Sequence, residues 1–195
     1  MSDKKQLEKI RGMSPEEQEQ VIRKIEQSAY EYEWLYGGCG RSTLRALQEG
    51  LGIDDGETFR AATPFSGGAH NNELCGALVG ALMAIGLVYA SGEFEQGKVE
   101  DRPLAVKSPV YERAGEQANK LCDRFREEFG GLNCRDVMQK LHGKVWNLQN
   151  PEERAEYVQP RLHDKCGEVA QKTARLAAGV ILEKYTEDSG WVLSR

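Results

Sequence analysis

The chain has 195 residues, of which 39% are hydrophobic and 29% are charged, a balance typical of a globular protein rather than of a disordered or membrane-spanning one. This length suits one domain of roughly 100–200 residues, so we expect residues 1–195 to fold as a single domain, with 1–13 and 186–195 as flexible ends. The formal net charge of −5, without any run of Lys or Arg, gives no attraction to phosphate backbones, so nucleic acid is not an expected partner.

The amino-terminal residues 1–11 contain neither the apolar segment nor the small-residue cleavage site of a secretory signal, which predicts a cytoplasmic protein. Stable disulfides are rare in that reducing compartment, and the odd number of cysteines, five, prevents complete pairing. Metal binding, redox chemistry and simple burial therefore remain as roles for the cysteines.

The first long helix is predicted from its capping residues. Ser14 can cap a helix, Pro15 suits the first helical position, and Glu17 completes a capping box. Apolar residues then recur at three- and four-residue steps as far as about Tyr36, where Gly37-Gly38 ends the pattern. We therefore expect one continuous helix with an apolar stripe that faces the core.

The same two signals, apolar spacing and capping residues, predict the rest of the helices. These are expected at about residues 40–50, 57–62, 74–90, 109–129, 134–141, 151–159 and 164–185. Residues 64–72 and 91–107 are predicted to be irregular, and a short hairpin could form in the second of these segments. No alternating pattern is long enough to predict a strand, so the expected fold class is all-α.

The helix expected at 74–90 is the most apolar part of the chain and contains no charged residue. It is shorter than the ~20 residues that a membrane span needs, so we predict a buried central helix of a compact bundle and no membrane partner. Gly76, Gly80 and Ala84 form a row of small side chains along it, where another backbone can approach closely. If that backbone belongs to a second subunit, the protein is a homodimer.

The cysteines are the residues most suited to chemistry. Cys39, Cys75, Cys134 and Cys166 all stand at or just before predicted helix starts, whereas Cys122 lies within a predicted helix. A helix N-terminus lowers the pKa of a thiol and stabilises negative charge, and an iron–sulfur cluster bound by thiolates is an anionic group. Free cysteine is also among the most commonly buried residues, and burial is the interpretation that we prefer for Cys122.

The three histidines of the chain allow other kinds of site than a cysteine-bound cluster. His70 precedes Cys75 in the irregular stretch, where it could be a ligand, a proton donor or simply a solvated side chain. His163 has the H-x-x-C spacing to Cys166, and His142 follows Cys134 by two helical turns. A mixed cysteine and histidine zinc site therefore remains an alternative to a cluster.

Four segments around the cysteines resemble a known family. They are C-G-R-S-T-L at 39–44, E-L-C-G-A-L-V-G-A-L at 73–82, F-R-E-E-F-G-G-L-N-C-R-D at 125–136 and D-K-C-G-E-V at 164–169. The second segment, with its C-G-A-x-x-G pattern, is the most specific. In order and in local context these segments resemble the C-GCAxxG-C-C family of bacterial and archaeal redox-active proteins, over roughly residues 30–185.

The resemblance implies an all-helical redox module, similar to the iron–sulfur part of split-Soret cytochromes, that forms a dimer. It implies that Cys39, Cys75, Cys134 and Cys166 hold an iron–sulfur cluster, whose nuclearity the sequence does not specify, and that electrons pass to a redox partner protein. Haem is not expected, because the chain has no C-x-x-C-H. The resemblance names no reaction, so an oxidoreductase activity stays open.

Two further functions remain compatible with the sequence. The protein could be a thiol–disulfide oxidoreductase or redox sensor without metal, in which two cysteines from different helix starts cycle between dithiol and disulfide. It could also be a helical interaction module whose cysteines are simply buried.

Overall fold

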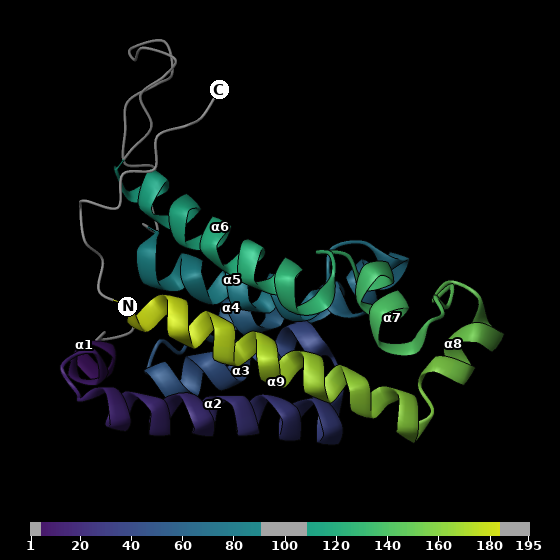
Figure 1. The fold of residues 1–195 in the computed structure, drawn as a ribbon, viewed down its shortest axis with the longest axis horizontal. Helices are drawn as coiled ribbons and strands as arrows, with labels where there is room; N and C mark the ends of the chain where they lie inside the picture. The colour runs from purple at the N-terminus through teal and green to yellow at the C-terminus, as the bar shows by residue number, and fades with distance from the viewer. Residues whose placement is uncertain (1–4, 91–108, 184–195) are drawn as a thin grey trace, which may run out of the picture.

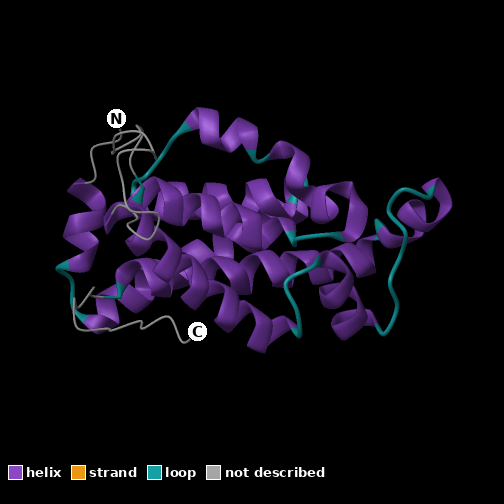
Figure 2. Ribbon diagram, turned by 90° about the horizontal axis from the view of Figure 1, so that it is seen from above, coloured by secondary structure: helices purple, strands orange, loops and turns teal. Residues whose placement is uncertain are grey.

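Helices form nearly all the regular structure in the part of the chain that is described (Figure 2). The computed structural model describes residues 5–90 and 109–183, except for the side chains of residues 109, 110 and 160–163. The helices are α1 (Lys5–Arg11), α2 (Pro15–Tyr36), α3 (Cys39–Leu51), α4 (Gly56–Ala61), α5 (Gly76–Tyr89), α6 (Pro109–Phe129), α7 (Cys134–His142), α8 (Pro151–Tyr157) and α9 (Pro160–Leu182), with the one-turn elements η1 (Thr63–Phe65) and η2 (Gly68–Asn72) before α5. The expectations for residues 91–107 and 186–195 lie outside the described residues.

The all-α prediction is confirmed, because the described residues contain one isolated bridge and no strand. The capping box before α2 is present: Ser14 Oγ accepts a hydrogen bond from the Glu17 N–H at 3.3 Å, and the Ser14 N–H donates to Glu17 Oε2 at 2.9 Å. Residues 5–11, which we expected within a flexible end, instead form α1 with Leu7 and Ile10 buried.

The last helix begins earlier than predicted. The sequence predicts a start at about Asp164, but α9 begins at Pro160. Proline suits the first turn of a helix, where its missing N–H has no helical partner to lose. The earlier start moves Cys166 away from the end of the helix and into its second turn.

The helices pack as a bundle in which α5 lies inside (Figure 1). α2 packs against α9 and α3, and α3 packs against α5, which also contacts α6 and α9. Most of α5 is buried, including Leu78, Ala81 and Ile85, so the predicted central helix is confirmed. No helix in the described ranges combines the length and apolar character needed to cross a bilayer.

The small residues of α5 allow α3 of the same chain to pack closely against it. A Cβ atom on Gly80 would lie 2.1 Å from the carbonyl oxygen of Gly40, and one on Gly76 would lie 2.5 Å from that of Phe65 and 2.7 Å from Cys39 Sγ. Only glycine permits such close backbone contact. Since α3 occupies this row, the row gives no support to a second subunit, and the homodimer stays a prediction.

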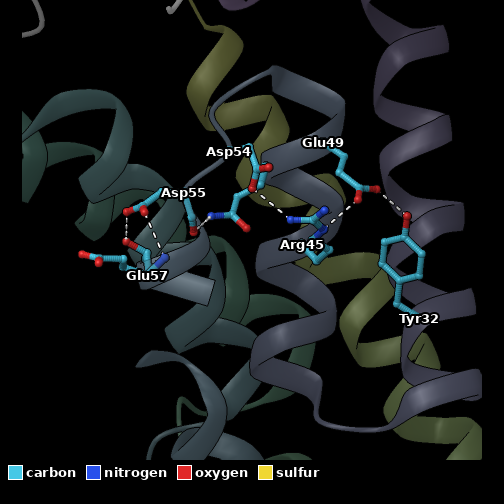
Figure 3. Close-up of polar contacts among 8 residues, drawn as sticks. Tyr32, Arg45, Glu49, Asp54, Asp55 and Glu57 are labelled. Carbon is cyan, nitrogen blue, oxygen red and sulfur yellow. Dashed lines mark hydrogen bonds and ion pairs between the residues drawn. The ribbon is translucent and has the colours of Figure 1, made fainter. Parts of the chain in front are cut away.

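A polar network on the outer side of α2 and α3 fixes these two helices to each other (Figure 3). The Tyr32 hydroxyl donates to Glu49, whose carboxylate also accepts from Arg45 Nε at 2.6 Å. Arg45 Nη1 in turn donates to Asp54 at 2.9 Å. Each exposed ion pair contributes at most about 1 kcal/mol, so we assign the network an orienting role for the carboxyl-terminal halves of α2 and α3.

Candidate functional site

The four cysteines that the sequence analysis selected line one cavity. It has a volume of about 170 Å³ and is bordered by Cys39, Cys75, Cys134 and Cys166. It involves α7 and α8, which lie at the end of the bundle where α9 begins (Figure 1). Cys39, Cys75 and Cys134 are only 8%, 3% and 8% exposed, and Cys166 is half-buried. Residues distant in sequence therefore place four cysteines around the same cavity, which is partly open to solvent.

Cys122 does not border the cavity. It lies half-buried in α6 and packs against the main core. This position agrees with the structural role preferred from the sequence.

A short backbone bridge holds the second and third cysteines side by side. The Cys75 N–H donates to the carbonyl oxygen of Leu132 at 2.9 Å, and the Cys134 N–H donates to that of Glu73 at 2.7 Å. These bonds form the isolated antiparallel bridge between Leu74 and Asn133. The starts of α5 and α7 are thereby fixed next to each other, so the separation of the two sulfurs does not depend on a flexible loop.

The helix-start prediction is correct for three cysteines and wrong for the fourth. Cys39 and Cys134 are the first residues of α3 and α7, and Cys75 is the N-cap of α5. Cys166 lies in the second turn of α9, where the unpaired N–H groups of the helix start do not reach it. Its sulfur instead lies 2.7 Å from the hydroxyl of Tyr157.

Burial dominates the acidity of these thiols. It raises the pKa of Cys75 to about 11 and that of Cys166 to about 12, from an ordinary value of 9.0, and it raises the pKa values of Cys39 and Cys134 as well. The backbone N–H groups of α5 partly offset this effect at Cys75, and the Tyr157 hydroxyl does so at Cys166. The helix ends therefore do not suffice to make these cysteines thiolates at neutral pH.

The sulfurs also influence one another. Burial is the largest cause of the raised pKa of Cys39, followed by Glu33 and then by the other three cysteine sulfurs. For Cys134, burial is again the largest cause of the raised pKa, followed by the sulfurs of Cys75 and Cys166. Like charges placed together in a site of low polarity cannot all ionise without a compensating cation. A positively charged centre in the cavity would supply that compensation.

These shifts predict that the metal-free protein is sensitive to alkali. The unfolded chain releases the Cys75 proton near pH 9.0, but the native protein holds it to about pH 11. The native state therefore binds more protons in this interval, so stability is fully present below about pH 9 and falls as the pH rises toward 11. The loss from Cys75 alone is on the order of 2 kcal/mol.

Thermal midpoints of the metal-free protein between pH 8 and pH 11 measure this loss. The matched variant Cys75→Ala should show a shallower decline, because it lacks one of the shifted groups. Equal slopes for the two proteins would show that Cys75 is not the source.

Glu33, which was not among the predicted site residues, borders the cavity from α2 and is 2% exposed. The Ser42 hydroxyl donates to Glu33 Oε2 at 3.0 Å. Glu33 follows the buried residues Ile25 and Ala29 at four-residue steps. A carboxylate that continues a buried stripe is the sequence signal that could have identified it.

Tyr157 was also missed. It is 8% exposed, and its ring centroid lies 5.4 Å from that of Trp146 and 6.2 Å from that of His142. Its pKa is raised well above the ordinary value, first by burial and then by the nearby Cys166 and Cys134 sulfurs. The hydroxyl therefore stays protonated and can donate a hydrogen bond to sulfur. No local motif marks this residue, because it comes from the short α8.

His70 and His142 border the cavity. His70 lies exposed in η2 with a left-handed backbone (φ +57°), and His142 lies at the end of α7. Burial lowers the pKa of His142, with a further contribution from Lys165, so its imidazole is neutral at pH 7. The side chain of His163 lies outside the described residues, which leaves its proposed pairing with Cys166 untested.

The donor set suits a metal centre, but the present side-chain positions do not form one for a single ion. Four sulfurs around one cavity are the ligands that iron–sulfur clusters use. Within residues 5–90 and 109–183, no three Cys, His, Asp or Glu side chains lie close enough together to hold one metal ion.

The comparisons with known proteins agree with the cysteine pattern. The family described as "Putative redox-active protein (C_GCAxxG_C_C)" matches residues 38–180, a range that includes all the cysteines bordering the cavity. No curated protein and no solved structure matches the chain. Because the match extends over most of its length, the chain belongs to the C_GCAxxG_C_C family of redox-active proteins.

Proposed function

We propose that this protein is an iron–sulfur redox protein, in which Cys39, Cys75, Cys134 and Cys166 hold one cluster. The observation that carries the proposal is that all four cysteines border the same cavity of about 170 Å³. A cluster held there would supply one-electron redox chemistry. The family match supports the general redox role, and the choice of iron and sulfide rests on the site itself.

The size of the cavity favours a group of several atoms over one ion. A tetrahedral zinc site holds its sulfur ligands only about 2.3 Å from the metal, which leaves no open space between them. The cavity here is several times larger than the share of liquid volume of one water molecule, ~30 Å³. A volume of this size leaves room for a group of several atoms among the four cysteines.

The chain contributes its own chemistry around such a centre. The bridge through Leu74 and Asn133 fixes two ligands, and the first turns of α3, α5 and α7 present N–H groups near three sulfurs. Hydrogen bonds to sulfur and exclusion of water are the main influences of a protein on cluster potential. The low exposure of Cys39, Cys75 and Cys134 keeps water away from the part of the cavity where these three residues lie.

A thiol–disulfide oxidoreductase is the main alternative, and the acidity of the thiols argues against it. Such an enzyme needs a thiolate as the attacking group, with a pKa near the ambient pH. Burial instead raises the pKa of Cys75 to about 11 and that of Cys166 to about 12. Zinc binding, and an interaction module with inert cysteines, are the other outcomes that the experiment below separates.

The proposal includes electron exchange with a redox partner protein, a cytoplasmic location and a homodimer. None of these follows from the cavity. The redox partner and the homodimer rest on the resemblance to the family.

Anaerobic purification, followed by analysis of iron, acid-labile sulfide and zinc and by a visible spectrum, tests the proposal. The expected result is iron together with sulfide, with a visible absorption that bleaches on addition of dithionite. If the purified protein is colourless, reconstitution with ferrous iron and sulfide is the second arm. Zinc without sulfide, or a protein that stays colourless after reconstitution, would contradict the proposal.

A further inference from the structure

Glu33 is the only carboxylate among the described residues that border the cavity. It reaches the site from α2 and is 2% exposed, so water does not screen it. The Ser42 hydroxyl, from the first turn of α3, holds one carboxylate oxygen at 3.0 Å. The orientation of this group is thus fixed by two helices that the structure packs together.

The electrostatic influence of Glu33 extends over most of the site. Glu33 lines the same cavity as three of the cysteines, Cys39, Cys75 and Cys166. A carboxylate that disfavours negative charge on these sulfurs also disfavours negative charge on any centre that they bind.

Tyr157 lies against the same site and has the opposite effect. Its oxygen is 2.7 Å from Cys166 Sγ. A sulfur bound to a metal carries no proton, so the hydroxyl is the donor in that state. A hydrogen bond from an O–H group to sulfur favours negative charge there.

We infer that Glu33 and Tyr157 are positioning residues that set the reduction potential of the centre in opposite directions. The inference rests on the proposed function. One-electron reduction, with the electron supplied by an electrode through mediators, adds one negative charge to the centre and breaks no bond. The Glu33 carboxylate opposes that added charge, and the Tyr157 hydroxyl stabilises it.

The other charged groups at the cavity are not expected to influence the reduction potential as strongly as Glu33 and Tyr157. Lys165 borders the cavity but forms an ion pair with Glu168 at 3.0 Å, and Arg154 is exposed. Solvent screens both cations more strongly than it screens the buried Glu33. His142 is neutral because burial lowers its pKa.

The test is a potentiometric titration of the iron-loaded protein and two variants. Glu33→Gln should make reduction more favourable by about tenfold in equilibrium constant or more, a shift of about 59 mV to less negative potential for one electron. Tyr157→Phe should shift the potential to more negative values. Glu31→Gln, an exposed change on the same helix, is the matched control and should leave the potential unchanged.

Opposite shifts distinguish this inference from a general loosening of the site, which would move both variants in the same direction. If the potentials of both variants shift in the same direction, or if Glu33→Gln behaves like the control, the inference is wrong.

Should Glu33→Gln fail to hold the centre, Ser42→Ala replaces it. That variant keeps the carboxylate but removes its hydrogen bond, so its potential should become more negative, and an unchanged value would overturn the inference. A wild-type protein without iron and sulfide would instead overturn the proposed function.

Discussion

The double variant Cys75→Ala/Cys134→Ala should lose its iron and acid-labile sulfide almost completely. The two residues are held together by the bridge through Leu74 and Asn133, and their loss leaves only two of the four sulfurs. Two remaining thiols cannot supply the ligands of a cluster that needs three or four. Iron and sulfide assays, with the visible spectrum of each protein, measure the loss.

Cys122→Ala is the matched control for this experiment. It removes one sulfur from the chain but none from the cavity, because Cys122 lies in α6 against the main core. It should keep the metal content and the spectrum of the wild type. The thermal transition of each metal-free protein shows whether it is folded. A folded double variant that retains its iron would mean that the cluster, if present, is bound elsewhere.

Gly80→Ala should destabilise the protein by about 3 kcal/mol or more. The new Cβ would lie 2.1 Å from the carbonyl oxygen of Gly40 and 3.2 Å from the backbone nitrogen of Leu44. Both neighbours are backbone atoms within α3, so the clash can be relieved only by moving that helix away from α5. Overpacking of this kind commonly costs 1–3 kcal/mol when side chains can adjust, and a backbone clash exceeds that case.

Gly86→Ala tests the same substitution where space is available. It lies on the same helix, and a Cβ there meets nothing within 4 Å. Alanine is the better helix former by up to about 1 kcal/mol, so this variant should be as stable as the wild type or slightly more stable. Urea midpoints of the three proteins give the comparison. Equal midpoints for the two alanine variants would contradict the close contact between α3 and α5.

Local signals in the sequence predicted most helices well. The capping box at Ser14 and the glycine pair after Tyr36 gave the correct bounds of α2, and the apolar run at 74–90 gave the central α5. The segment of α1 was missed because only seven residues form it and only two of them are buried. Packing against the rest of the bundle, rather than local periodicity, stabilises so short a helix.

The candidate site was predicted in part, because cysteine chemistry can be identified from single residues but assembly cannot. The helix-start argument selected the cysteines that border the cavity, although for Cys166 its premise was wrong, since α9 begins at Pro160. Glu33 and Tyr157 were missed because their roles depend on which helices meet at the cavity. Neither belongs to a cysteine segment, and their proximity to sulfur follows from tertiary packing alone.

The most direct measurement of the central claim is the position of iron in crystals of the protein grown anaerobically, found by anomalous scattering at the iron edge. The account predicts iron within the cavity, bound to Cys39, Cys75, Cys134 and Cys166 at the separations of iron–thiolate bonds. Iron at any other place in the chain, or a cavity whose four sulfurs stay as separate thiols in iron-loaded protein, would contradict it.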